Sequence, residues 1–75
     1  MVHNRVALLR TELGISRQEL AEKVGVNYQT IGFIERGDYS PSLELAFKIA
    51  AYFNVELTEV FSDRPFPSLF KKKEN

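Results

Sequence analysis

Apolar residues recur at intervals of three and four along most of the chain, which is the spacing of helices that bury one face. Val6, Leu9 and Leu13 fall on one side of a first helix, expected over residues 4–13. Gly14 follows at the position where a left-handed cap commonly ends a helix. The first element is therefore predicted to be a short amphipathic helix.

Two further short helices follow. Ser16 and Glu19 form a capping box, so a second helix is expected to begin there and to end at Gly25. Asn27 is a favoured N-cap residue, so a third helix is expected over residues 27–36, before the next glycine. The inward face of the second helix is predicted to consist of Leu20, Ala21 and Val24.

The second and third helices carry a joint pattern. Ala21 is small where the next helix must pass close above it, and Gly25 tolerates the positive φ of a tight turn. Ile31 and Ile34 then point inward from the third helix. Together these features predict two helices locked at a steep angle, a helix-turn-helix over residues 17–36.

A fourth and a fifth helix complete the prediction. Ser40 and Pro41 indicate an N-cap followed by proline at the first helical position. The apolar stripe of the fourth helix is predicted to contain Leu43, Ala46, Ile49, Ala50 and Phe53. A short fifth helix is expected over residues 57–61. Because the breaks between helices are only a few residues long, we expect a compact all-α domain of five helices.

The end of the chain has a different pattern. Two prolines bracket Phe66, so residues 63–67 cannot be helical. The tail also carries Leu69 and Phe70, and its large apolar groups either fold back onto the domain or form an extended arm that pairs with a second copy. The predicted division is a domain over residues 1–62 and a C-terminal tail over residues 63–75.

Composition limits the function. Seventy-five residues make one small domain, too small for a sizeable catalytic pocket. Cysteine is absent and His3 has no partner at ligand spacing, so we expect no metal, no cofactor and no enzyme activity. The start of the chain does not have the pattern of a secretory signal, and no apolar run reaches membrane-span length. A cytoplasmic location is therefore expected, while the formal net charge of zero favours no class of partner.

Residues 16–37 carry the string SRQELAEKVGVNYQTIGFIERG, and residues 39–50 follow with YSPSLELAFKIA. This pattern resembles the lambda repressor/Cro-like helix-turn-helix regulators, the Xre family, and the resemblance covers residues 4–61. It implies five α-helices with the third as recognition helix. It also implies a homodimer that binds two-fold operator DNA and represses or activates transcription.

The candidate DNA-binding residues lie on the second and third helices and beside them. They are Arg10, Arg17, Gln18, Asn27, Tyr28, Gln29, Thr30, Phe33, Arg36, Tyr39 and Ser40. Gln29 has the amide that pairs bidentately with adenine, and Tyr28 or Phe33 suits a thymine methyl group. Asn27 and the amides at the start of the third helix suit a phosphate, while Thr30 suits a base or a phosphate.

The resemblance implies two further roles. Arg10 pairs with Glu35 and also faces DNA. Relatives more often carry glutamine where Arg17 stands, with Gln18 beside it here, so either of these two residues is the phosphate contact. Gly32 is unusual inside a helix, where it costs about 0.5–1 kcal/mol relative to alanine. Either the backbone there approaches a base pair closely, or the position merely tolerates glycine.

Two predictions concern partners. The dimer surface is expected to use the fifth helix and the tail, through Val60, Phe61, Phe66, Leu69 and Phe70. The alternative to a DNA-binding regulator is a protein-interaction module, similar to an antitoxin, on the same fold. A positive rim of Arg10, Arg17 and Arg36 around the third helix would favour DNA. Neutralisation of that rim by Glu12, Glu19 and Glu35 would favour a protein.

Overall fold

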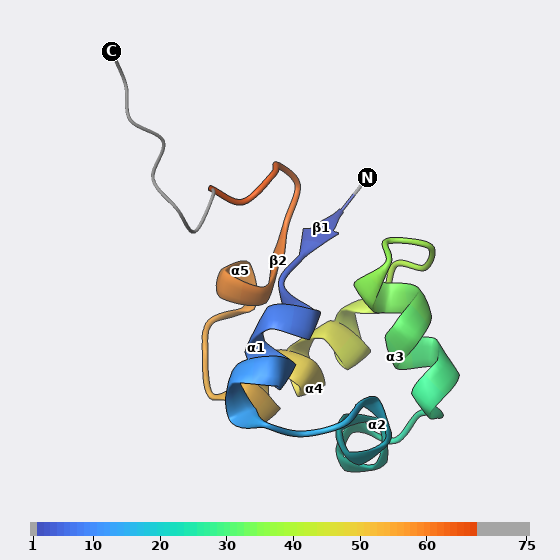
Figure 1. The fold of residues 1–75 in the computed structure, drawn as a ribbon. Coiled ribbons are helices and arrows are strands. Elements are labelled where there is room, and N and C mark those ends of the chain that lie inside the picture. The colour runs from blue at the N-terminus through green and yellow to red at the C-terminus, as the bar shows by residue number, and fades with distance from the viewer. Residues whose placement is uncertain (1, 68–75) are drawn as a thin grey trace.

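Five helices and one short strand pair make up residues 2–67, the part of the chain that the computed structural model describes (Figure 1). The helices are α1 (Val6–Leu13), α2 (Arg17–Val24), α3 (Tyr28–Glu35), α4 (Leu43–Phe53) and α5 (Leu57–Val60). The strands are β1 (His3–Asn4) and β2 (Phe61–Ser62). The predicted five-helix architecture is therefore confirmed. Across residues 2–67, no helix has both the length and the apolar character needed to cross a membrane.

Side-chain caps start three of the helices. The side chains of Ser16 and Asn27 each accept a hydrogen bond from the backbone N–H three residues on, at 3.0 Å, as predicted. The cap of α4 is Ser42, whose hydroxyl accepts from the N–H of Leu45 at 3.1 Å. The prediction of Ser40 as cap and Pro41 as first helical residue is therefore wrong. Ser42 holds the extended backbone of an N-cap, with φ −61° and ψ 160°, so the helix begins only after it.

The turn between α2 and α3 is the one that the sequence indicated. Gly25 has a φ of 83°, in the left-handed region, and its N–H donates to the carbonyl of Ala21 at 2.8 Å. Ala21 is buried, and its helix α2 packs against α3. The small residue and the glycine therefore have the predicted roles in setting the two helices across one another.

One apolar core lies between the helices. It consists of Val6, Leu20, Ala21, Val24, Ile31, Ile34, Leu45, Ala46, Ile49, Ala50, Val60 and Phe61. Leu13 and Leu43, which the spacing placed on buried faces, are instead 55% and 66% exposed. Leu13 is the last residue of α1 and Leu43 the first of α4, so each projects past the neighbouring helices into solvent.

The strand pair joins the two ends of the domain. Strands β1 and β2 run antiparallel, with His3 opposite Ser62 and Asn4 opposite Phe61. Val60 and Phe61, at the junction of α5 and β2, are 0% and 9% exposed. The expectation that these two residues line a dimer surface is therefore wrong, because their side chains fill the core of their own chain. Leu69 and Phe70, also predicted there, lie outside the described residues.

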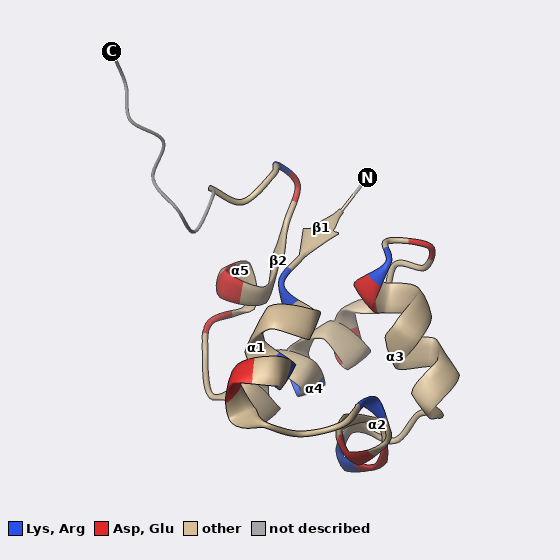
Figure 2. Ribbon diagram, in the orientation of Figure 1, with Lys and Arg blue, Asp and Glu red and all other residues tan. Residues whose placement is uncertain are grey.

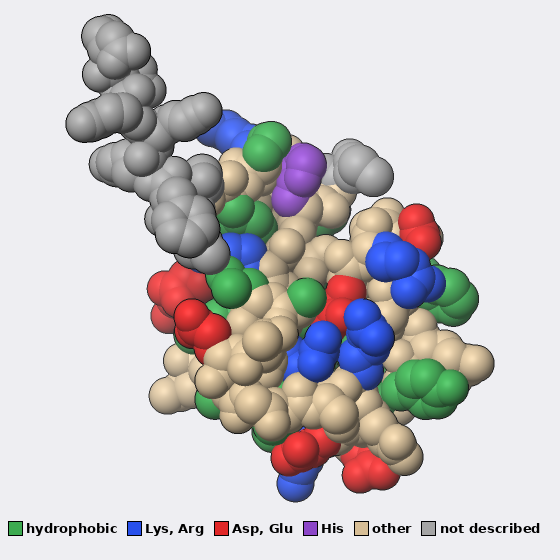
Figure 3. Space-filling model, in the orientation of Figure 1, with side chains coloured by type: hydrophobic (Ala, Val, Ile, Leu, Met, Phe, Trp, Pro, Cys, Tyr) green, Lys and Arg blue, Asp and Glu red, His purple; other side chains and the backbone are tan. Residues whose placement is uncertain are grey.

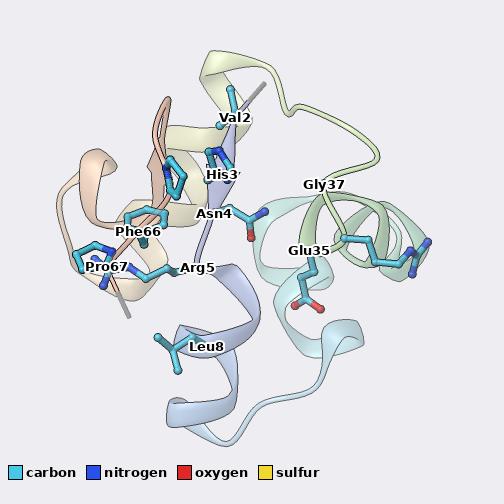
Figure 4. Close-up of a pocket in the computed structure, with 11 residues that line it drawn as sticks. Val2, His3, Asn4, Arg5, Leu8, Glu35, Gly37, Phe66 and Pro67 are labelled. Atoms are coloured by element: carbon cyan, nitrogen blue, oxygen red, sulfur yellow. The ribbon is translucent and has the colours of Figure 1, made fainter. Parts of the chain in front are cut away.

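The first part of the tail folds back onto the domain. The Arg5 guanidinium lies 4.3 Å from the centre of the Phe66 ring, a cation–π contact, and its Nε donates to the carbonyl of Glu59 at 3.0 Å. Figure 4 shows Phe66 and Arg5 side by side at the edge of an open hollow beneath β1. The sequence left two possibilities for the tail, and Phe66 follows the first of them, in which the tail folds back onto its own domain.

Asn4 ties the strand pair to two helices. Its Nδ2 donates to the carbonyl of Ile34 at 2.8 Å, and its Oδ1 accepts from the N–H of Val6 at 3.0 Å. The side chain therefore holds the start of α1 and the end of α3 together (Figure 4).

We expect Asn4→Ala to lower the free energy of unfolding by about 1–3 kcal/mol, since it leaves the partly buried N–H of Val6 without a partner and removes one of the two hydrogen bonds to the Ile34 carbonyl, which keeps the bond from the Gly37 N–H. Urea unfolding measures this. The control is Thr11→Ala, which removes only an exposed bond to the Ala7 carbonyl. A loss for Asn4→Ala no larger than that of the control would contradict the role of Asn4.

Candidate nucleic-acid interface

One long side of α3 faces solvent. Tyr28 and Phe33 are 54% and 47% exposed, and Gln29 is exposed between them. The helix carries no charged side chain before Glu35, so most of its ribbon is tan in Figure 2. Its outer face therefore presents an amide and two aromatic rings, with charge only at the end.

Six residues enclose a shallow, open hollow of about 150 Å³ against this face. They are Arg17, Tyr28, Gln29, Gly32, Phe33 and Arg36. All but Gly32 were predicted as DNA-binding residues, and the structure brings them together. Gly32 itself is buried beneath two guanidinium side chains: a Cβ there would lie 3.4 Å from Arg36 Nη1 and 3.9 Å from Arg17 Nε.

A carboxylate between three helices positions the arginines. The Glu35 side chain is only 3% exposed and accepts from Arg10 Nε at 2.7 Å and from Arg17 Nε at 2.8 Å. Arg10 also donates through Nη1 to the Ile15 carbonyl at 2.9 Å. The Arg10–Glu35 pair is the one that the resemblance implied. The participation of Arg17 was not foreseen, because no local pattern links residues 17 and 35.

The charge around α3 is positive on balance. Arg10, Arg17 and Arg36 supply three positive charges, and their partners Glu35 and Asp38 supply two negative ones, which leaves a surplus of one. Arg36 also lies over the Phe33 ring, 5.1 Å from its centre. Figure 3 shows basic side chains gathered over this face beside the hydrophobic side chains of its outer edge. Glu12 and Glu19 line no part of the hollow.

The other predicted residues lie around the hollow rather than in it. Asn27 uses its Oδ1 within the chain, accepting from the Thr30 N–H and hydroxyl at 3.0 and 3.1 Å. Gln18 is exposed on α2 beside Arg17. Tyr39 and Ser40 are exposed in the loop after α3. The structure therefore divides the predicted site into a central hollow and a surrounding rim.

The described residues 2–67 contain no cluster of three or more histidine or acidic side chains arranged to hold a metal ion. Every buried side-chain nitrogen and oxygen in that part of the chain has a hydrogen-bond partner. The chemistry available at this face is hydrogen bonding, apolar contact and cationic attraction.

Comparisons with known proteins point to the same segment. The model of the helix-turn-helix family matches residues 6–60. An uncharacterised HTH-type transcriptional regulator of Archaeoglobus fulgidus is 45% identical over 60 residues, covering 80% of this chain and 86% of that protein. The cryptic phage CTXphi transcriptional repressor RstR of Vibrio cholerae is 33% identical over 63 residues, covering 84% and 57%.

A solved structure has the same fold. The restriction-modification controller protein C.AhdI from Aeromonas hydrophila is 34% identical, with a TM-score of 0.69 over 73% of this chain and 83% of that one. The family match spans well over half of the chain and includes α2, the Gly25 turn and α3. The chain therefore belongs to the helix-turn-helix family of transcriptional regulators, the lambda repressor/Cro-like proteins that its sequence resembles.

Proposed function

We propose that this regulator binds DNA sequence-specifically, as a homodimer that places α3 of each copy in the major groove of a two-fold operator. The observation that carries the proposal is the outer face of α3, uncharged and exposed, with arginines beside it. The major groove admits an α-helix, and its base edges are read by amide and apolar groups. Two copies would contact half-sites about 34 Å apart, one turn of DNA.

Base reading is assigned to the outer face of α3. Gln29 is exposed and free to pair with adenine, and Tyr28 and Phe33 supply the apolar contact for thymine methyl groups. Thr30 is half-buried, and its hydroxyl donates to Asn27. This arrangement favours a half-site rich in A·T pairs.

Backbone contacts are assigned to the cations around that face. Arg17 is held at one nitrogen by Glu35 while its side chain stays 49% exposed, so it is pre-oriented and still accessible to a phosphate. Arg10, Arg36 and the loop residues Tyr39 and Ser40 extend the contact along the strand. Such contacts position the protein without reading sequence.

The biological role that fits best is a repressor or autoregulator in the cytoplasm. RstR is a phage transcriptional repressor and C.AhdI a restriction-modification controller. We assign DNA binding to residues 1–62 and treat residues 63–75 as a tail. The rival role is a protein-interaction module on the same fold, for which the exposed Tyr28, Phe33 and Tyr39 are the relevant observation.

Selection from a random DNA pool tests the proposal. We expect the natural chain to select a two-fold consensus, and a Gln29→Ala, Phe33→Ala double variant to lose it, because those side chains supply the base contacts. Glu22→Ala, an exposed change on α2 away from the hollow, is the control. Weak, salt-sensitive and sequence-blind binding by the natural chain would contradict base reading and favour a protein partner.

Gly32 allows a test in which stability and affinity move in opposite directions. The Cβ of Gly32→Ala would make ordinary contact with Arg36, and the φ there is not positive, so we expect the variant to be about 0.5–1 kcal/mol more stable. If DNA approaches closely over Gly32, the same methyl group weakens operator binding. Thermal unfolding and titration with the selected operator measure the two effects. Unchanged affinity would show that the position merely tolerates glycine.

The choice between Arg17 and Gln18 as phosphate contact is made by salt dependence. We expect Arg17→Ala to reduce the slope of log affinity against log salt by about 1, because one fewer phosphate is neutralised. Gln18→Ala leaves the slope unchanged because glutamine is neutral. If Gln18→Ala loses more affinity than Arg17→Ala, and Arg17→Ala keeps the salt slope of the natural chain, the phosphate contact belongs to Gln18.

A further inference from the structure

Helix α4 has an apolar outer face in addition to its buried one. Leu43 and Phe47, one turn apart, are 66% and 53% exposed, and Ala51, a further turn on, is exposed as well. We call these three residues the α4 face. The core contacts of the same helix are made by Leu45, Ala46, Ile49 and Ala50. Nothing in residues 2–67 covers the α4 face.

Such a face is unusual for a helix on the surface of a small domain. A surface helix ordinarily carries polar residues opposite its buried stripe. Neighbouring exposed apolar side chains mark interaction sites more often than isolated ones do. Leu13 is similarly exposed but belongs to α1 and is not part of the α4 face.

We propose that the α4 face is the surface through which two copies of this chain associate, with the two α4 helices crossing antiparallel about a two-fold axis. A two-fold contact brings the same patch of each copy together, so the patch must be complementary to itself. Leu43 and Phe47 satisfy this requirement with apolar side chains at both ends of the contact. The proposal gives the proposed homodimer a surface other than the one predicted from sequence.

The charges beside the α4 face favour a second copy as the occupant. Glu44 and Lys48 lie one turn apart on α4, both well exposed, with their charged groups 3.9 Å apart. In an antiparallel crossing, Glu44 of one copy approaches Lys48 of the other, and the reverse pair forms across the axis. Opposite charges one turn apart therefore make the flank complementary to itself, whereas two charges of one sign would repel.

The position of α4 in the chain also connects this surface to the DNA-binding face. Only residues 36–42 separate the end of α3 from the start of α4. A two-fold axis at the α4 face would therefore fix the spacing between the two recognition helices through a short segment of each chain. In this respect the inference rests on the proposed function, although the association itself is measurable without DNA.

The chain's own tail is the competing occupant. Phe66 and Pro67 line the hollow beneath β1, together with residues of β1, α1 and the end of α3, and that hollow contains no residue of α4 (Figure 4). The described tail thus leads along a different part of the molecule. Whether Leu69 and Phe70, in residues 68–75, take part in dimerisation is tested below with a variant of these two residues.

The experiment is sedimentation equilibrium of the full chain without DNA, from low to high micromolar concentration. We expect the natural chain and the matched control Leu13→Ser to dimerise, and Leu43→Ser, Phe47→Ser to weaken association by roughly tenfold or more. Circular dichroism at low concentration shows whether each variant is folded. A monomeric natural chain, or a double variant that is folded and dimerises like the natural chain, overturns the proposal.

A charge exchange tests the self-complementary flank. Lys48→Glu leaves two negative charges beside each α4 face, so we expect it to weaken dimerisation, and adding Glu44→Lys to restore it. The double variant Leu69→Ser, Phe70→Ser of the full chain is expected to dimerise like the natural chain. If this variant no longer dimerises, the contact between copies belongs to the tail. Because these measurements contain no DNA, a failure of the α4 face to mediate dimerisation can be told apart from a failure of the chain to select an operator.

Discussion

The arrangement of this domain depends on one buried carboxylate. Glu35 is almost inaccessible to solvent, and a carboxylate in that position must be neutralised by cations that bond to it directly. Arg10 from α1 and Arg17 from α2 both meet it, so a single group at the end of α3 fixes that helix against two others. The same bonds hold the two guanidiniums at the edge of the exposed outer face of α3, to which we assign DNA binding. Fold and function therefore share this interaction.

The elements with local signals were predictable from the sequence. Ser16, Asn27 and Gly25 act through their immediate neighbours, so their side-chain chemistry was enough to place the ends of α2 and α3. The pattern of Ser40 followed by Pro41 predicted the cap of α4 two residues too early, because the extended backbone that makes Ser42 the cap is not visible in the sequence. Strands of two residues have no periodicity to detect, and β1 and β2 were consequently missed.

The site was predicted in outline for a similar reason. Side chains that point outward from α3 follow from the inward positions of Ile31 and Ile34, so Tyr28, Gln29 and Phe33 were placed correctly on the surface, whereas Thr30 is half-buried. The bond from Arg17 to Glu35 depends on how α2 and α3 cross, and the residue pattern of either helix alone does not reveal that crossing. The burial of Val60 and Phe61 likewise depends on β2 pairing with the far end of the chain.

The pairing of β1 with β2 has a consequence for the order in which the domain folds. Helices α2 and α3 meet through contacts that are close in sequence, whereas His3 and Ser62 meet only when almost the whole chain has closed into a loop. Closing such a loop loses much chain entropy before any contact offsets it, so the strand pair is expected to form late and to fray early. Asn4 belongs to that pair and also holds the end of α3. Helix α3 thus receives its last restraint from the terminal strands, and a partly frayed molecule would hold that helix less firmly while keeping most of its core.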